Sequence, residues 1–203
     1  ELLRMQIKQL ADSPYPVLIH GESGSGKELA AQNLHSCSQR KEHPFLTLNC
    51  AAFNGELLAS QLFGHARGAF TGATESKPGF FEEAGQGTLL LDEIADLPID
   101  LQAKLLRVLE NGEYYRVGET QPRMSKARVL AASNKNLIEA IDKGLFREDL
   151  YHRLSVLSIR VPSVNEREQD KLVLLEFFQQ KLDQQLKSFV LDDESKKLWM
   201  LYD

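Results

Sequence analysis

Five short apolar runs, separated by longer segments with helical spacing, constrain the fold of this chain more than any other sequence feature. The runs are Val17–Ile19, Phe45–Leu48, Thr88–Leu91, Arg128–Ala132 and Leu157–Val161. Strands that read as continuous apolar runs are typical of parallel sheets buried on both faces, with helices in the connections. Leu101, Leu105 and Leu109 show such helical spacing. The sequence therefore predicts an α/β fold with a parallel five-stranded sheet between helices.

The stretch Pro162–Asp170 marks a predicted domain boundary. It is polar, it begins with proline, and only helix-forming sequence follows it. The chain has 203 residues, of which 42% are hydrophobic, so it is long enough to bury a sizeable core. We therefore expect an α/β domain over residues 1–162 and part of a small helical lid over residues 163–203.

The charge balance limits the partners of this chain. Lys and Arg total 24 against 29 Asp and Glu, a formal net charge of −5. Because this balance offers no basic field for a nucleic-acid backbone, we expect DNA contact only through a domain absent from this chain. No apolar run approaches the roughly 18 residues of a membrane span, so we expect no membrane contact and a cytoplasmic location. Cys37 and Cys50 lack metal-ligand spacing, which fits a reducing cytosol.

A glycine-rich segment lies between the first apolar run and a helical stretch. It consists of Gly21, Glu22, Ser23, Gly24, Ser25, Gly26 and Lys27. The glycines let backbone N–H groups turn toward phosphate oxygens, the helix N-terminus adds partial positive charge, and Lys27 reaches the β- and γ-phosphates. The alternative is an ordinary turn with a surface lysine, but the spacing and context favour a Walker A nucleotide site. Glu28 replaces the usual Ser or Thr ligand of Mg²⁺, so another carboxylate must hold the metal.

That carboxylate follows the third apolar run, which ends in Asp92 and Glu93. Asp92 is predicted to hold Mg²⁺, and Glu93 is predicted to orient and polarise the attacking water. Two adjacent acids are often only solvated surface charge, but the upstream phosphate loop favours the catalytic interpretation. The two motifs together predict an ATP·Mg²⁺ site and an ATPase.

A short loop between these motifs carries a third signal. Its residues are Gly68, Ala69, Phe70, Thr71, Gly72 and Ala73, and the segment Leu62–His65 precedes it. The glycines let the loop change conformation at a low cost in energy, and within the loop only Phe70 and Thr71 can make directional contacts. Physics alone leaves open a turn whose Phe is buried in the core. In these motifs the chain resembles the bacterial activators of sigma-54 RNA polymerase, which are AAA+ P-loop ATPases with the signature GAFTGA.

The resemblance covers essentially the whole chain and implies partners and roles. It implies that residues 68–73 contact sigma-54 in the RNA polymerase holoenzyme and drive remodelling of the closed complex. It also implies a homo-oligomeric, hexameric ring, and it makes Glu28 an expected residue. By the same resemblance Asn49 is the switch asparagine that holds Glu93, although a strand-end Asn often caps its own turn. Ser133 and Asn134 correspond to sensor I.

The segment Phe146–Leu154 is similar to the FREDLYYRL segment of the family, with His152 in place of a Tyr. The resemblance makes Arg147 and Arg153 arginine fingers that reach the γ-phosphate of a neighbouring subunit. Arg suits this task because its planar fork stays charged and binds phosphate oxygens in pairs. Composition alone would favour surface pairs with Glu148 and Asp149.

Three other features complete the comparison with the family. Val117–Lys126 resembles a variable second surface loop that cooperates with GAFTGA, and Asn165 stands where the family usually has Arg. The resemblance further implies that the sensor II arginine is missing, because the chain stops before that segment. Two other classes of function stay open: a nucleotide sensor without hydrolysis, and another AAA+ machine such as a chaperone or helicase loader, which would lack GAFTGA.

Overall fold

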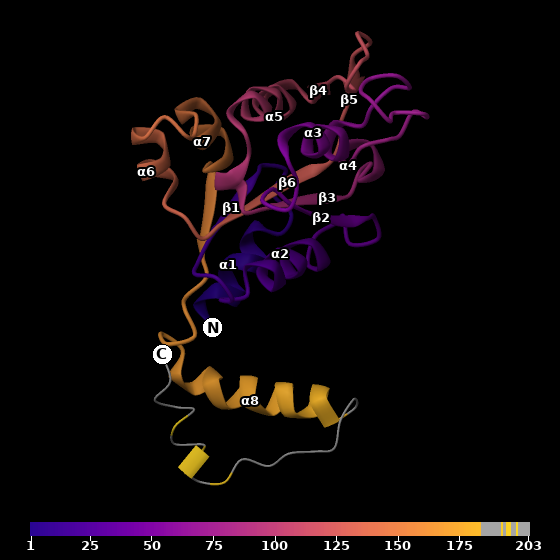
Figure 1. Cartoon of the computed structure of the whole chain (residues 1–203). Coiled ribbons are helices and arrows are strands. Elements are labelled where there is room, and N and C mark those ends of the chain that lie inside the picture. The colour runs from indigo at the N-terminus through magenta and orange to yellow at the C-terminus, as the bar shows by residue number, and fades with distance from the viewer. Residues whose placement is uncertain (184–191, 193, 196–197, 199–203) are drawn as a thin grey trace. The chain divides into compact units, whose positions relative to one another are not determined.

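The computed structural model describes residues 1–183, 192, 194, 195 and 198 (Figure 1). The chain divides into two compact units, Glu1–Val161 and Pro162–Asp203. In the second unit, helix α8 spans Glu168–Asp183. Most of the expected lid beyond residue 183 lies outside the described residues. Within the described part, no helix is long and apolar enough to cross a membrane.

The first unit is built on one parallel sheet. Its strands, in spatial order, are β2 (Phe45–Asn49), β3 (Thr88–Asp92), β6 (Arg128–Ser133), β1 (Val17–His20) and β7 (Leu157–Arg160). Every neighbouring pair is parallel. All five apolar runs therefore form the strands, and the predicted α/β fold with a parallel five-stranded sheet is confirmed.

Helices cover both faces of this sheet (Figure 1). The helices on one face are α1 (Leu2–Leu10) and α2 (Lys27–Ser36). Those on the other are α3 (Gly55–Phe63), α4 (Phe80–Glu83), α5 (Ile99–Asn111), α6 (Leu137–Asp142) and α7 (Glu148–Leu154). Successive strand side chains alternate between these faces, so Leu90 packs on the α2 side while Leu89 and Leu91 pack on the α5 side. Each such buried leucine contributes roughly 2 kcal/mol to stability.

A small hairpin was not anticipated from the sequence. Strands β4 (Glu113–Tyr114) and β5 (Arg123–Met124) pair antiparallel after α5, and they enclose most of the expected second surface loop. Strands of two residues are too short to produce an alternating pattern, so sequence periodicity could not have revealed them. The hairpin stands apart from the five-stranded sheet.

Candidate functional site

The candidate nucleotide site lies at the carboxyl edge of the parallel sheet. Asn49 is in register with Asp92, and His20, which precedes the phosphate loop, is in register with Ser133. Because parallel strands present their carboxyl ends to one edge, these residues gather there although they are far apart in the chain. The segment Gly68–Ala73 and the predicted fingers Arg147 and Arg153 lie in other parts of the chain.

The phosphate loop runs from β1 into α2, as predicted. Gly24 and Gly26 have φ angles of 73° and 96°, which other residues rarely adopt. A Cβ on Gly21 would lie 2.7 Å from Ser25 Oγ and 2.8 Å from the carbonyl oxygen of Val161, so a side chain there would clash. Each of the three glycines is therefore required by the geometry of the loop.

Lys27 is the first residue of α2 and folds back over this loop. It is only 7% exposed, and its Nζ donates to the carbonyl oxygens of Gly21 and Glu22, both at 3.0 Å. Its ammonium group thus lies against the loop that would hold phosphate. The loop residues Glu22 and Ser23 are exposed and Ser25 is buried. Exposed backbone N–H groups and a positioned ammonium are the parts an anion site needs.

Glu93 has the most unusual environment of the predicted catalytic residues. Its φ is 50°, the single positive value found for a non-glycine residue in the described part of the chain. Its Oε2 is buried and, among the described residues, has no hydrogen-bond partner. A left-handed residue costs about 1–2 kcal/mol, and a buried unpaired oxygen adds to that cost. Such costs cluster at functional sites, where the surrounding fold maintains them.

The neighbouring residues form local contacts at the same edge. Asp92 Oδ1 accepts the backbone N–H of Glu93 at 3.0 Å. Asn49 Oδ1 accepts the N–H of Ala51 at 2.9 Å, so this side chain caps its own turn. Ser133 Oγ donates to the carbonyl of Lys135 at 2.9 Å and accepts its N–H at 3.0 Å. The switch role of Asn49 and the sensor role of Ser133 therefore stay predictions.

The segments that follow two of the strands are also joined by an ion pair. Lys135 Nζ lies 2.5 Å from Asp96 Oδ1, which connects the segment after β6 with the short helix η1 (Ile94–Asp96) after β3. Asn134 is exposed beside this pair. The segments that follow β3 and β6 are therefore joined by charged side chains, and the two strands are joined by their pairing in the sheet.

The carboxylates suit a metal that binds together with phosphate. Among the described residues, no three or more His, Cys, Asp or Glu side chains form a group that could cage an ion. Mg²⁺ usually keeps several waters and binds through one or two carboxylates and substrate phosphates, so Asp92 beside the phosphate loop fits it. Glu28 is exposed, and its Oε1 accepts from Gln32 Nε2 at 3.4 Å along the helix surface.

The loop Gly68–Ala73 closes on itself. The N–H of Gly68 donates to the carbonyl of Ala73 at 2.8 Å, and the N–H of Ala73 donates to the carbonyl of Phe70 at 3.0 Å. The Phe70 ring is half-buried and meets the His65 ring edge-on at 5.0 Å between centroids, while Thr71 is exposed. In this structure Thr71 is thus presented to solvent, and Phe70 is partly covered.

The second surface loop is tied to the loop Gly68–Ala73. The N–H of Ala66 donates to the carbonyl of Val117 at 2.9 Å. A Cβ on Gly118 would lie 2.8 Å from Ala69 Cβ, so the two loops are in close contact. Glu82 of α4 forms ion pairs with Arg116 at 2.8 Å and with Arg123 at 3.4 Å, and these pairs tie the hairpin to α4.

The predicted arginine fingers lie at the two ends of α7. Arg147 precedes the helix and donates two hydrogen bonds to Asp149, at 3.0 and 2.6 Å. These bonds hold the pKa of Asp149 below its usual value and raise the pKa of Arg147. Arg153 Nε donates to the carbonyl of Leu109 at 3.2 Å. Within one chain, Arg147 therefore forms the surface pair that composition alone favoured.

Sequence reasoning missed Gln102, a fully buried amide on α5. It hydrogen-bonds the backbone of three other residues, described below. The available signal was a polar residue on the apolar face of a helix, next to Leu101 and three positions before Leu105. A residue of that kind normally has a specific bonding partner.

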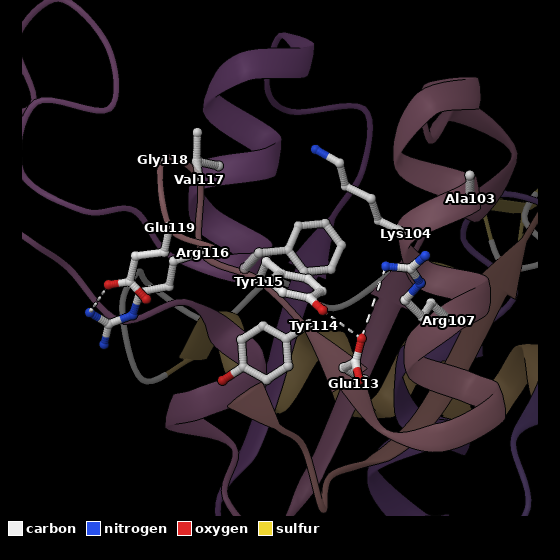
Figure 2. A pocket seen from close by; sticks show the side chains of 11 residues that line it. Ala103, Lys104, Arg107, Glu113, Tyr114, Tyr115, Arg116, Val117, Gly118 and Glu119 are labelled. Atoms are coloured by element: carbon white, nitrogen blue, oxygen red, sulfur yellow. Dashed lines mark hydrogen bonds and ion pairs between the residues drawn. The ribbon is translucent and has the colours of Figure 1, made fainter. Parts of the chain in front are cut away.

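A cavity of about 450 Å³ lies between α5 and the hairpin (Figure 2). Tyr115 donates to Glu113 Oε1 at 2.8 Å at its wall, and Arg107 lies 4.0 Å from the same carboxylate. None of the predicted nucleotide-site residues lines it. The candidate nucleotide site lies instead at the carboxyl edge of the sheet, where β1 leads into the glycine-rich loop.

Comparisons with known proteins agree with these motifs. The family profile described as "Sigma-54 interaction domain" matches residues 1–160. The chain is 53% identical over 169 residues to the nitric oxide reductase transcription regulator NorR1 of Cupriavidus necator, covering 83% of this chain and 33% of that protein. It is 46% identical over 198 residues to the DNA-binding transcriptional regulator NtrC of Proteus hauseri, covering 97% of this chain and 42% of that protein. The chain thus spans about two fifths or less of these relatives.

Solved structures give the same result. NtrX from Brucella abortus in complex with ADP has a TM-score of 0.92 and 36% sequence identity, covering all of this chain and 44% of that one. NtrX in complex with ATP has a TM-score of 0.91 at the same identity, covering all of this chain and 46% of that one. The fold is therefore the AAA+ P-loop fold, as the resemblance implied. The chain belongs to the family of sigma-54-dependent transcription activators, whose sigma-54 interaction domain it carries.

Proposed function

We propose that this chain hydrolyses ATP to ADP and phosphate in a homo-oligomeric ring, and that it uses the reaction to remodel the closed complex of sigma-54 RNA polymerase. The observation that carries the proposal is Glu93, a strained residue with a buried unpaired carboxylate oxygen directly after Asp92. A fold keeps such a costly residue where it has a chemical task. The related NtrX structures in complex with ADP and ATP support nucleotide binding by a chain of this fold.

The phosphate loop, Asp92 and Glu93 would have separate roles in this reaction. The loop from Gly21 to Gly26 and the ammonium of Lys27 would bind the phosphates, with Lys27 exchanging its carbonyl partners for phosphate oxygens. Asp92 would hold Mg²⁺, which neutralises charge on the phosphates when bound. The free Oε2 of Glu93 would accept a proton from the attacking water.

The neighbouring subunit would complete the site. Arg147 and Arg153 would supply positive charge to the γ-phosphate of the adjacent subunit, and this requires Arg147 to leave Asp149. Because the pair is roughly half exposed, breaking it costs little. Asn49, Ser133 and Asn134 would report the nucleotide state to the rest of the domain.

The loop Gly68–Ala73 would move in response to the nucleotide and contact sigma-54. Thr71 is already exposed, and release of Phe70 from His65 would present both side chains to sigma-54. A nucleotide shifts such a loop only if it binds the two loop states with different affinity. The close packing against Gly118 supplies a second surface that must move with it.

Glu93→Gln tests the chemical step. Removing a general base costs about 10²–10⁴ in rate, so ATP turnover of the purified oligomer should fall by at least about a hundredfold while ATP binding persists. Glu83→Gln, an exposed acid on α4, serves as the matched control and should keep full turnover. Unchanged phosphate release by Glu93→Gln would remove Glu93 from this role.

Thr71→Ala tests the coupling to polymerase. We expect ATP turnover within about twofold of the unsubstituted protein, because Thr71 is exposed and outside the nucleotide site, with loss of sigma-54-dependent open complexes. Thr74→Ala, an exposed threonine just beyond the loop, should retain both activities. An equal loss of turnover and open-complex formation would show that Thr71 serves the fold and not the coupling.

A further inference from the structure

Gln102 of α5 is a side chain with no exposed surface that bonds three backbone groups. Its Nε2 donates to the carbonyl of Leu97 at 2.7 Å and to the carbonyl of Leu145 at 3.0 Å. Its Oε1 accepts the backbone N–H of Arg147 at 2.8 Å. Both amide hydrogens and the amide oxygen are therefore used, which an apolar side chain of the same size could not reproduce.

One end of this bridge leads to the catalytic carboxylate. The turn after β3 is held by the N–H of Asp96 on the carbonyl of Glu93, at 2.9 Å, and by the N–H of Leu97 on the carbonyl of Ile94, at 3.1 Å. Leu97 is thus part of one hydrogen-bonded turn that begins at Glu93. Through its hydrogen bond to the carbonyl of Leu97, Gln102 is attached to the end of that turn.

The other end leads to the predicted finger. Leu145 and Arg147 flank Phe146, which is anchored in the core with 3% exposure, and Arg147 is the residue from which α7 starts. Gln102 holds one backbone group on each side of Phe146. The main chain of Arg147 is therefore fixed, while its guanidinium remains at the surface with Asp149.

We propose that Gln102 is a positioning residue that sets the Arg147 finger in register with the Glu93 turn of the same subunit. The proposal rests on the proposed function, because the finger serves the nucleotide site of the neighbouring subunit. A displacement of the Glu93 turn on hydrolysis would pass through one buried amide to the backbone of Arg147. The nucleotide state of one subunit would thereby change the position of its Arg147 guanidinium at the nucleotide site of the neighbouring subunit.

The first test is Gln102→Met in the purified oligomer. Misplacing a catalytic group by about 1 Å can cost on the order of a hundredfold, so we expect kcat to fall roughly tenfold to a hundredfold. The Kd for a non-hydrolysable ATP analogue should stay within about twofold, because the phosphate loop is untouched. Val108→Ala truncates a buried apolar side chain on the same helix, which cannot form a hydrogen bond, and it should lose stability yet keep kcat.

Mixed rings separate positioning from a merely structural role. Glu93→Gln subunits bind ATP without turning it over, but they carry an intact Gln102 and Arg147. Mixing them with Gln102→Met subunits should raise turnover above the sum of the two separate preparations, because a Gln102→Met subunit, whose Glu93 is intact, can then receive a well-placed finger from a Glu93→Gln neighbour. No rise on mixing, or an equal loss of kcat in Val108→Ala, would overturn the proposal.

Two further variants keep the result interpretable. If Gln102→Met does not fold, Gln102→Asn takes its place in both assays, since it keeps the amide but is one methylene too short to reach all three groups. Arg147→Ala tests the underlying function. Unchanged turnover in Arg147→Ala would reject the finger itself, whereas a loss there with full turnover in the Gln102 variant would reject only the positioning role.

Discussion

At the scale of single residues, an unreactive thiol, that of Cys50, lies beside the predicted catalytic residues at the carboxyl edge of the sheet. Cys50 follows Asn49, is almost fully buried, and donates its N–H to the carbonyl of Asp92 at 2.9 Å. Burial, aided by the negative charge of Asp92, Asp96 and Glu93, raises the pKa of the Cys50 thiol to about 12. The thiolate is the nucleophilic form, so this thiol is inert beside the site.

Thiol labelling tests this environment. At pH 8 we expect iodoacetamide to modify the exposed Cys37 in the folded protein and to leave Cys50 unmodified, with both residues reacting in urea. Mass spectrometry of peptides gives the extent at each position, and Cys37→Ser provides a protein with only the buried thiol. Comparable labelling of Cys50 and Cys37 in the folded state would contradict the buried position.

At the scale of elements, the loops that would contact polymerase join a closely packed pair of backbone segments. Gly64 and Gly79 bring two backbone segments into close contact, and a Cβ on Gly79 would lie 2.2 Å from the nitrogen of Gly64 and 2.4 Å from the carbonyl carbon of Phe63. His65 pairs with Lys77 on one side and Val117 on the other, just above this contact. Because these segments pack closely, we expect movement to occur mainly in the adjoining loop Gly68–Ala73.

Gly79→Ala tests this close approach. Because the added Cβ would clash with backbone atoms of Leu62, Phe63 and Gly64, we expect a loss of about 3 kcal/mol in the free energy of unfolding. Gly85→Ala has a φ of 54° but open space around the added methyl, so it should cost only about 1 kcal/mol. Urea unfolding of both variants measures the difference, and equal losses would show that this close packing tolerates a side chain.

At the scale of the whole first unit, charged and titratable groups are buried between the sheet and α1 or α2. Arg128 of β6 is 2% exposed and donates to the carbonyls of Leu10 and Ala11, so it caps the end of α1. Burial, assisted by the charge of Arg40, lowers the pKa of Arg128 to about 10. His35 of α2 is buried too, with Nδ1 3.0 Å from Thr88 Oγ1.

The pH dependence of stability follows from His20, which is partly buried, and His35, which is buried. Burial lowers the pKa of both His20 and His35, so the unfolded chain binds protons at pH values where the folded chain keeps these rings neutral. Stability is therefore fully present above about pH 6.5, the unfolded value, and is lost as the pH falls toward the folded values. Urea unfolding at pH 7.5 and 5.5 should give lower stability at pH 5.5.

Substitution identifies the groups responsible. His20→Gln with His35→Gln should flatten the loss of stability between the two pH values, whereas the exposed His152→Gln should leave it unchanged. A slope that survives in the double variant would assign the effect to other groups.

Much of the site follows from local sequence. The apolar runs become parallel strands, and parallel strands deliver Gly21, Asp92 and Ser133 to one edge because their carboxyl ends coincide. The glycine spacing before Lys27 and the acidic pair after a buried strand are likewise local patterns. The sequence by itself therefore determined the fold class and the position of the predicted phosphate loop and acidic pair at the carboxyl edge of the sheet.

Only the tertiary structure decided how these parts are connected. The bonds of Gln102 to Leu145 and Arg147, and the ring contact of Phe70 with His65, depend on where helices and loops pack. The positive φ of Glu93 and its buried carboxylate oxygen are also imposed by the surrounding fold. Periodicity records which face of an element is buried, but it does not record which distant backbone group a buried polar side chain meets.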